Sequence, residues 1–189
     1  MLSEAVENSI LFSDCDFTSA KWWNGITDKI VIYAPDDTVP AGITPYYVYV
    51  ELSELGKNTF AMAIPDTLTD DWSDTVIFLN NAVGEDNNPF YHFVHDNELL
   101  ELMIEHTICH EMGHVLKLAH TYDDLNPVFN HICEDTRTEY PLKNVAFLSV
   151  MNYGAIFDPD LQWLTTLKPS YHDKLTLISR WECHYDCEN

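Results

Sequence analysis

The chain has 189 residues and carries 31 Asp and Glu against 9 Lys and Arg, a formal net charge of −22 at pH 7. Hydrophobic residues make up 46% and aromatic residues 13%, so the chain can bury a core and is not disordered as a whole. The negative charge argues against nucleic acid or an anionic membrane as a partner, because phosphates would repel the protein. No apolar run approaches the ~20 residues that a membrane-spanning helix needs.

The length fits one domain, residues 1–189, with two lobes. In chain order, the N-terminal lobe (1–120) is expected to hold a short helix and four strands, at 16–25, 30–34, 45–52, 59–64 and 75–80. Asp96 then caps a long helix in which apolar residues recur every three or four positions up to about residue 116. The C-terminal lobe (121–189) is expected to be irregular until a last helix opens near Ser170. This order predicts an α+β fold with an α/β-type N-terminal lobe.

The five cysteines leave at least one thiol unpaired in a monomer; they are Cys15, Cys109, Cys133, Cys183 and Cys187. These cysteines either form disulfides, as in an extracytoplasmic protein, or remain reduced thiols, and the sequence is compatible with both. The first eight residues lack the basic flank and apolar stretch of a signal peptide. We therefore expect either a cytosolic protein or a mature form from which a signal has been removed.

The long helix contains the sequence His110-Glu111-Met112-Gly113-His114. Residues four apart lie on the same helix face, so His110 and His114 can reach one metal ion. Glu111 lies beside them and can contact a metal-bound water without being a ligand itself. A catalytic zinc needs a third protein ligand and an open position for water.

Two histidines are candidates for the third ligand. His106 is on the same helix face, but His106 and His114 are separated by about 12 Å of helix rise, too far for one metal. His120 follows His114 by six residues and can fold back if the helix ends near Lys117. A helix that continued would place His120 on the wrong face. His120 is therefore the preferred third ligand.

This zinc pattern is followed by Ser149-Val150-Met151-Asn152-Tyr153, in which Met151 lies 31 residues after His120. Together the two motifs resemble the metzincin clan of zinc metallopeptidases, which pair a long histidine motif with a methionine turn under the metal. Within the clan, the pappalysin-like group and the matrixin-like secreted bacterial enzymes are both possible placements. The strong motifs cover about residues 106–121 and 149–153, and looser similarity reaches the last helix.

The resemblance implies a zincin fold with a twisted mixed sheet, a long active-site helix and a smaller irregular C-terminal lobe that ends in a helix. It implies His110, His114 and His120 as zinc ligands and Glu111 as general base and acid in peptide-bond hydrolysis. It further implies Met151 as the hydrophobic floor of the site. Tyr153 matches a tyrosine that some subfamilies place near the metal. The implied protein is a secreted zinc endopeptidase with a protein or peptide substrate.

The substrate would lie extended along a sheet edge by β-augmentation, following the usual arrangement of the clan. The segment expected to supply that edge is Thr59, Phe60, Ala61, Met62 and Ala63. Three acidic loops are read either as calcium sites or as solvated loops; they contain Asp70-Asp71, Glu85-Asp86 and Asp158-x-Asp160.

One position departs from the family pattern. The glycine that ends the helix and turns the chain toward the third histidine is Lys117 here. The turn favours positive φ, which Lys can adopt at a cost of about 1 kcal/mol. Lys117 leaves open an alternative, a catalytically weak or inactive zinc-bearing binding module. The intact Glu111 speaks against that alternative, because a structural zinc needs no base.

Overall fold

The computed structural model describes residues 9, 11–12, 17–64, 72–118, 120, 149–151 and 168–182. The elements of this part are two 3-10 helices, three strands and two α-helices: η1 (Thr18–Trp23), β1 (Val48–Ser53), β2 (Ala61–Ala63), β3 (Thr75–Asn80), η2 (Pro89–Phe93), α2 (Asn97–Val115) and α5 (Tyr171–Glu182). Several residues singled out in the sequence lie outside the described residues: Tyr153, Cys15, Cys133, Cys183, Cys187, Asp70, Asp71, Asp158 and Asp160. Most of the expected C-terminal lobe lies outside them as well.

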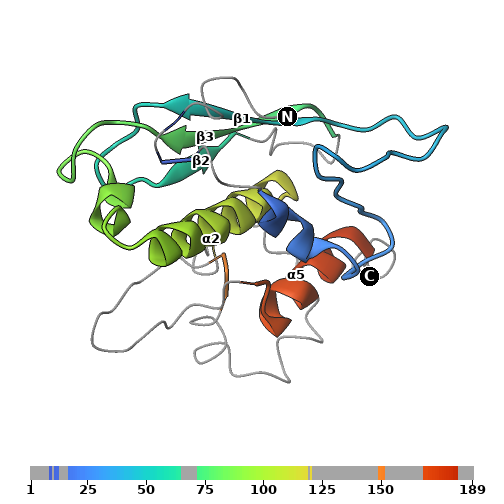
Figure 1. Ribbon diagram of the computed structural model, residues 1–189. Helices are drawn as coiled ribbons and strands as arrows, with labels where there is room; N and C mark the ends of the chain where they lie inside the picture. Colours follow the sequence, from blue (N-terminus) through green and yellow to red (C-terminus); the bar gives the residue numbers. More distant parts are fainter. Residues whose placement is uncertain are drawn as a thin grey trace.

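The three strands form one mixed sheet in the order β1-β3-β2. β1 runs parallel to β3, with Val50 opposite Ile77, and β2 runs antiparallel to β3, with Met62 opposite Phe78. Figure 1 shows α2 running beneath this sheet and α5 lying on the side of α2 away from it. The described part is therefore a mixed α+β structure, as predicted.

The predicted strand at 30–34 is wrong: these residues are described and belong to no strand. The side chain of Asn24 explains why this β-branched run needs no strand partner. Its Oδ1 accepts a hydrogen bond from the Ile32 N–H at 2.7 Å, and its Nδ2 donates to the Ile32 carbonyl at 2.8 Å. One side chain thus satisfies the backbone groups that a neighbouring strand would otherwise pair.

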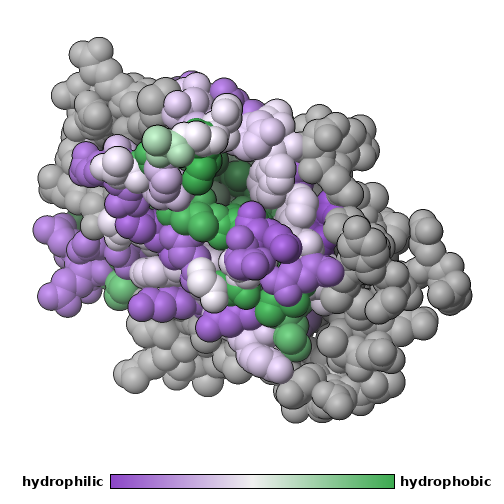
Figure 2. Space-filling model, turned by 90° about the vertical axis from the view of Figure 1, so that its right-hand side faces the viewer, coloured by the Kyte–Doolittle hydropathy of each residue, from purple (hydrophilic) through white to green (hydrophobic). Residues whose placement is uncertain are grey.

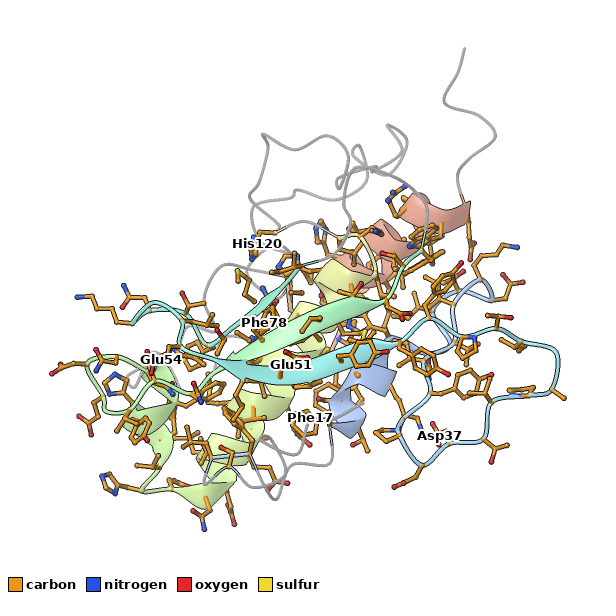
Figure 3. All side chains as sticks on the ribbon, turned by 90° about the horizontal axis from the view of Figure 1, so that it is seen from above. Phe17, Asp37, Glu51, Glu54, Phe78 and His120 are labelled. Carbon is orange, nitrogen blue, oxygen red and sulfur yellow. The ribbon has the colours of Figure 1, made fainter. Side chains whose placement is uncertain are left out.

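The other predicted strands are confirmed with shifted ends. β3 covers the predicted residues 75–80, whereas β1 begins three residues later than expected and β2 is limited to Ala61–Ala63. Alternation along the strands directs Val50, Ile77 and Leu79 into the core and leaves Glu51 exposed on the opposite face. Figure 3, which looks down on the sheet, shows Glu51 and Phe78 on the face turned away from α2.

Helix α2 begins where the sequence predicts, because the Asp96 side chain accepts a hydrogen bond from the Leu99 N–H at 3.1 Å. Its C-terminal half is buried on nearly all sides, since the sheet covers one side and η1 and α5 pack elsewhere. On η1, Trp23 is 1% exposed and its Nε1 donates to the Cys109 carbonyl at 2.9 Å. On α5, the Trp181 Nε1 donates to the Leu116 carbonyl at 3.1 Å. These two indole groups fix the C-terminal half of the helix against its neighbours.

A long loop follows η1 and extends over residues 24–47, with exposed apolar side chains at Val31, Ile43, Tyr46 and Tyr47. Figure 2 looks onto the side of the molecule where this loop lies. It shows hydrophobic side chains around a hollow near the middle of that face, with hydrophilic side chains beside them. Among the residues described, no helix is both long and apolar enough to cross a membrane.

Candidate metal centre

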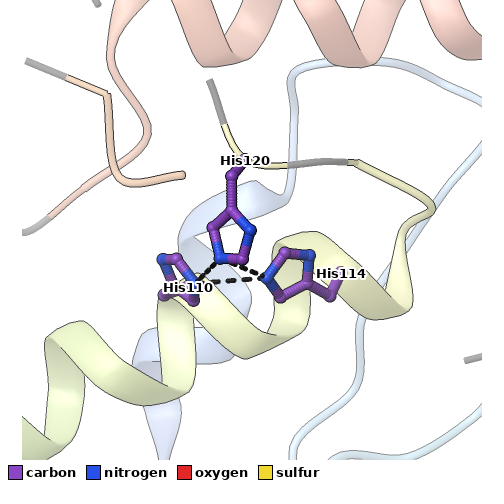
Figure 4. A group of neighbouring side chains, drawn as sticks. All are labelled: His110, His114 and His120. Atoms are coloured by element: carbon purple, nitrogen blue, oxygen red, sulfur yellow. Dashed lines mark hydrogen bonds between the residues drawn. The ribbon is translucent and has the colours of Figure 1, made fainter. Parts of the chain in front are cut away.

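His110, His114 and His120 bring one ring nitrogen each to a common point (Figure 4). The Nε2 atoms of His110 and His114 are 3.2 Å apart, and His120 Nε2 lies 3.2 Å from the first and 3.1 Å from the second. The helical spacing explains the first pair, because positions four apart share one face of α2. The third ring comes from the segment after the helix. The cluster that the sequence pattern predicts is therefore assembled in the structure.

A tight turn after α2 is what returns His120 to the helix. The Lys117 N–H donates to the His114 carbonyl at 2.9 Å, and the Leu118 N–H donates to the Gly113 carbonyl at 3.0 Å. This pair of bonds is the Schellman motif, which needs a left-handed residue just after the helix. Lys117 takes that role with φ 68°, so the lysine adopts the conformation predicted for the family glycine. The departure from the family pattern does not prevent the turn.

Two backbone carbonyls set the orientation of the helical imidazoles. His110 Nδ1 lies 2.7 Å from the Val150 carbonyl oxygen, and His114 Nδ1 lies 2.8 Å from the Leu118 carbonyl oxygen. A carbonyl oxygen only accepts, so each Nδ1 must carry the proton. The Nε2 of each neutral ring then presents a lone pair to the cluster. Such outer hydrogen bonds are typical of histidines that bind a metal.

Burial favours the neutral form of two of these rings. Desolvation, with the neighbouring charge of His114 as the next cause, lowers the pKa of His110 well below its usual value. The same two causes lower the pKa of His120 to about 4. When both rings are neutral and carry their proton on Nδ1, the Nε2 atoms of His110 and His114 face each other as acceptors at 3.2 Å. A cation bound by all three nitrogens would attract each lone pair and offset the repulsion between them.

The spacing of the three nitrogens fits a metal ion. Ligand atoms held at about 2.0–2.1 Å in a tetrahedral site lie about 3.3 Å from one another. The observed separations of 3.1–3.2 Å are close to that value. In the described part of the chain, this is the one group of three or more His, Cys, Asp or Glu side chains able to hold a metal ion. His106 is buried one turn earlier and does not belong to the group, as predicted.

Glu111 follows His110 in the helix but points its carboxylate to the sheet. Its Oε2 accepts a hydrogen bond from the Ala63 N–H at 2.7 Å, and the residue is only 6% exposed. Burial raises the pKa of Glu111 to about 7, while the bond from Ala63 acts in the opposite direction. The helix thus carries a buried carboxyl group that is anchored to strand β2 and is not one of the metal-binding side chains.

Strand β2 lies at an edge of the described sheet, where the sequence analysis expected a substrate to dock. The Ile64 N–H donates to the Val76 carbonyl and the Asn80 N–H donates to the Phe60 carbonyl. Backbone pairing in an antiparallel ladder alternates, so the N–H and C=O groups of Ala61 and Ala63 point away from β3. Of these groups, the Ala63 N–H is already bonded to Glu111.

Met151 packs against α2 at Gly113, a contact that the sequence analysis missed. Met151 is 3% exposed, and a Cβ added to Gly113 would lie 2.2 Å from its sulfur atom. It would also lie 3.0 Å from a ring carbon of Trp23. Glycine inside a strong helix signal is costly, and this cost was the available hint of a close approach.

Asp173 is a residue that the sequence analysis did not single out. It lies in the first turn of α5 and is 1% exposed. Its carboxylate accepts hydrogen bonds from the Ser149 hydroxyl and from the Val150 N–H. Ser170-x-x-Asp173 is a recognisable helix-capping pattern, but nothing in the spacing signals the contact with residues 149 and 150.

Cys109 precedes the first ligand and is fully buried as a free thiol. Burial, followed by the nearby charge of Asp173, raises its pKa well above the usual value. It therefore behaves as a small core residue.

Comparisons of this chain with protein-family models, with curated proteins and with solved structures found no match.

Proposed function

We propose that this chain is a zinc-dependent endopeptidase with a metzincin-like catalytic domain. The observation that carries the proposal is the convergence of three Nε2 atoms at 3.1–3.2 Å beside a buried carboxyl group. Three imidazoles suit zinc as the metal, and three protein ligands leave the fourth position open for water. His110, His114 and His120 are the proposed ligands.

His110, His114 and His120 would hold the zinc ion, which would supply a bound water with a pKa lowered toward ~7 and a Lewis acid for the scissile carbonyl. Glu111 is the proposed general base, which takes the proton of the attacking water and later gives it to the departing amine. The Ala63 N–H holds Oε2 of this carboxylate at 2.7 Å. That bond orients the Glu111 carboxylate. The other carboxylate oxygen, Oε1, is proposed to carry the proton from the water to the leaving amine.

The proposed substrate is an extended peptide paired with the free edge of β2. Segment 59–63 supplies this edge, where the Ala61 N–H and the carbonyls of Ala61 and Ala63 point away from β3. The Ala63 N–H already donates to Glu111, so it is not available to a substrate carbonyl placed opposite it. We propose that this carbonyl is the scissile one, which the zinc ion would polarise next to Glu111.

Under this proposal Met151 forms the floor of the metal site, and its packing on Gly113 supports that role. Tyr153 is proposed to assist in stabilising the oxyanion of the reaction, and the enzyme is proposed to act outside the cytoplasm. The other candidate is a zinc-bearing binding module without activity. The feature that favoured it was Lys117, and the φ of 68° at this residue removes that argument.

A peptide-library digest with the full chain tests the proposal. The wild type should cleave peptides, and a zinc chelator should abolish the cleavage. Glu111→Gln keeps the size of the side chain but removes the base, so it should retain stoichiometric zinc and lose about 10²- to 10⁴-fold in rate. Glu101→Gln alters an exposed carboxylate on the same helix and should leave the rate unchanged. Stoichiometric zinc without Glu111-dependent cleavage would overturn the proposal in favour of the binding module.

A further inference from the structure

The carboxylate of Asp173 is buried behind the metal centre and makes more hydrogen bonds than a helix cap requires. Its Oδ2 accepts from the Ser170 N–H and from the Ser170 hydroxyl, both at 2.8 Å. In return, the Asp173 N–H donates to the Ser170 hydroxyl at 3.3 Å. These reciprocal bonds form a capping box at the start of α5 and account for one part of the Asp173 contacts.

The remaining contacts of Asp173 reach across to the methionine turn, residues 149–151. Oδ1 accepts from the Ser149 hydroxyl at 2.5 Å, and Oδ2 accepts from the Val150 N–H at 2.9 Å. The Ser149 oxygen in turn accepts from the Met151 N–H at 3.0 Å. Ser149 and Val150 are fully buried, so these bonds are shielded from water. The carboxylate therefore holds the methionine turn against the first turn of α5.

Val150 connects this anchor to the metal centre. Its N–H is bonded to Asp173, and its carbonyl accepts the hydrogen bond from His110 Nδ1 at 2.7 Å. The bond to Val150 sets both the tautomer and the ring orientation of His110. A shift of Val150 would therefore move the Nε2 of His110 relative to the other two rings.

We propose that Asp173 is a positioning residue of the metal centre: it fixes Val150 so that the Val150 carbonyl orients His110 for metal binding. This inference rests on the proposed metal site. The chain of bonds runs from α5 through the methionine turn to α2, and each link is a direct hydrogen bond. Loss of an outer hydrogen-bond partner of a metal ligand typically weakens metal binding about 10- to 100-fold.

The test is a titration of the metal-free full chain with Co²⁺, followed by competition with Zn²⁺. Asp173→Ala should raise the dissociation constant for both ions about 10- to 100-fold and change the visible spectrum of bound cobalt. Ser149→Ala removes one of the two bonds to the methionine turn and should give a smaller change in the same direction. Asp173→Asn keeps the side-chain shape and should restore much of the affinity.

Ser170→Ala is the matched control, because it breaks the capping box but leaves the bonds between Asp173 and the methionine turn. It should lower the melting temperature while the metal affinity and the cobalt spectrum stay as in the wild type. If Asp173→Ala does not fold, Ser149→Ala decides the question, because it removes one bond to the methionine turn and is expected to shift the metal affinity. Wild-type affinity and spectrum in all variants that fold would overturn the positioning role and leave the metal site intact. A wild type that binds neither ion would overturn the proposed function, and the positioning role with it.

Discussion

Two polar clusters in the described part of the chain differ in how their atoms are matched. The first lies at the end of β3, where Asn80 is fully buried. Its Nδ2 donates to the Thr59 carbonyl at 2.8 Å, and its Oδ1 accepts from the Ala82 N–H at 3.0 Å. The Asn88 Nδ2 donates to the Asn80 carbonyl at 2.7 Å. Each of these contacts joins a donor to an acceptor, so this cluster is complete within the protein.

The second cluster is that of the three histidines, whose ring nitrogens converge on one point. The Nδ1 atoms of His110 and His114 face carbonyl oxygens, as donors should. Their Nε2 atoms, however, face each other as acceptors at 3.2 Å. We infer from this contrast that a cluster of paired donors and acceptors stabilises the fold, whereas a cluster of converging ring nitrogens indicates a site for a cation.

The largest effect should come from removing a ligand. His114→Ala should weaken zinc binding by more than about 100-fold, beyond the loss expected for an outer hydrogen-bond partner. The free energy of unfolding of the metal-free protein should change by less than about 1 kcal/mol, because one Nδ1 bond is lost. Zinc competition and denaturant unfolding measure the two quantities. His95→Ala changes an exposed histidine and should alter neither; equal zinc affinity in both variants would contradict the ligand role.

Asn80→Ala should show the opposite pattern. It leaves the backbone groups of Thr59 and Ala82 without their side-chain partner, and should lower the free energy of unfolding by about 2–3 kcal/mol. Zinc affinity of the folded variant should equal that of the wild type. The neighbouring Asn81 is exposed, and Asn81→Ala should be nearly neutral in denaturant unfolding. A large loss of zinc affinity in Asn80→Ala would show that the two clusters are not separate.

Gly113→Ala tests the packing behind the histidine cluster. Alanine is the better helix former by about 1 kcal/mol, but its Cβ would lie 2.2 Å from the Met151 sulfur. We expect the overpacking to dominate and to destabilise the protein by about 1–3 kcal/mol in thermal or denaturant unfolding. At Gly56 the nearest atom to an added Cβ is 3.6 Å away, so Gly56→Ala is the tolerated control. A stabilised Gly113→Ala variant would contradict the close approach of Met151.

The smallest expected effect concerns the turn that brings His120 to the cluster. Lys117→Gly and Lys117→Ala both remove the side chain, so their difference isolates the backbone cost of φ 68°. The glycine variant should be more stable by about 1 kcal/mol, because glycine adopts the left-handed region without steric penalty. Chemical denaturation compares the two directly. Equal stability would indicate that the turn relaxes when the side chain is absent.

Much of the candidate site follows from local spacing. The capping residue Asp96, the apolar period of α2 and the four-residue spacing of its histidines all depend on neighbours within one or two helical turns. The return of His120 was predictable once the helix was expected to end near Lys117. Each of these features depends on the chain's local geometry, which a single sequence displays.

The rest depends on contacts between distant segments, which leave no period in the sequence. The bond between Ser149 and Asp173 spans 24 residues, and the approach of Met151 to Gly113 joins the methionine turn to α2. The failure at 30–34 has the same origin. Asn24 supplies the hydrogen bonds of a missing strand from a position outside the β-branched run, and no propensity scale records such a side chain.

The most direct test of the central claim is a zinc titration of the metal-free wild-type chain, read by calorimetry. The three histidines should bind one zinc ion per chain, and a chelator should remove it. Three ring nitrogens that converge at 3.1–3.2 Å predict this stoichiometry. No zinc binding, or binding that is unchanged when His114 is replaced, would contradict the account.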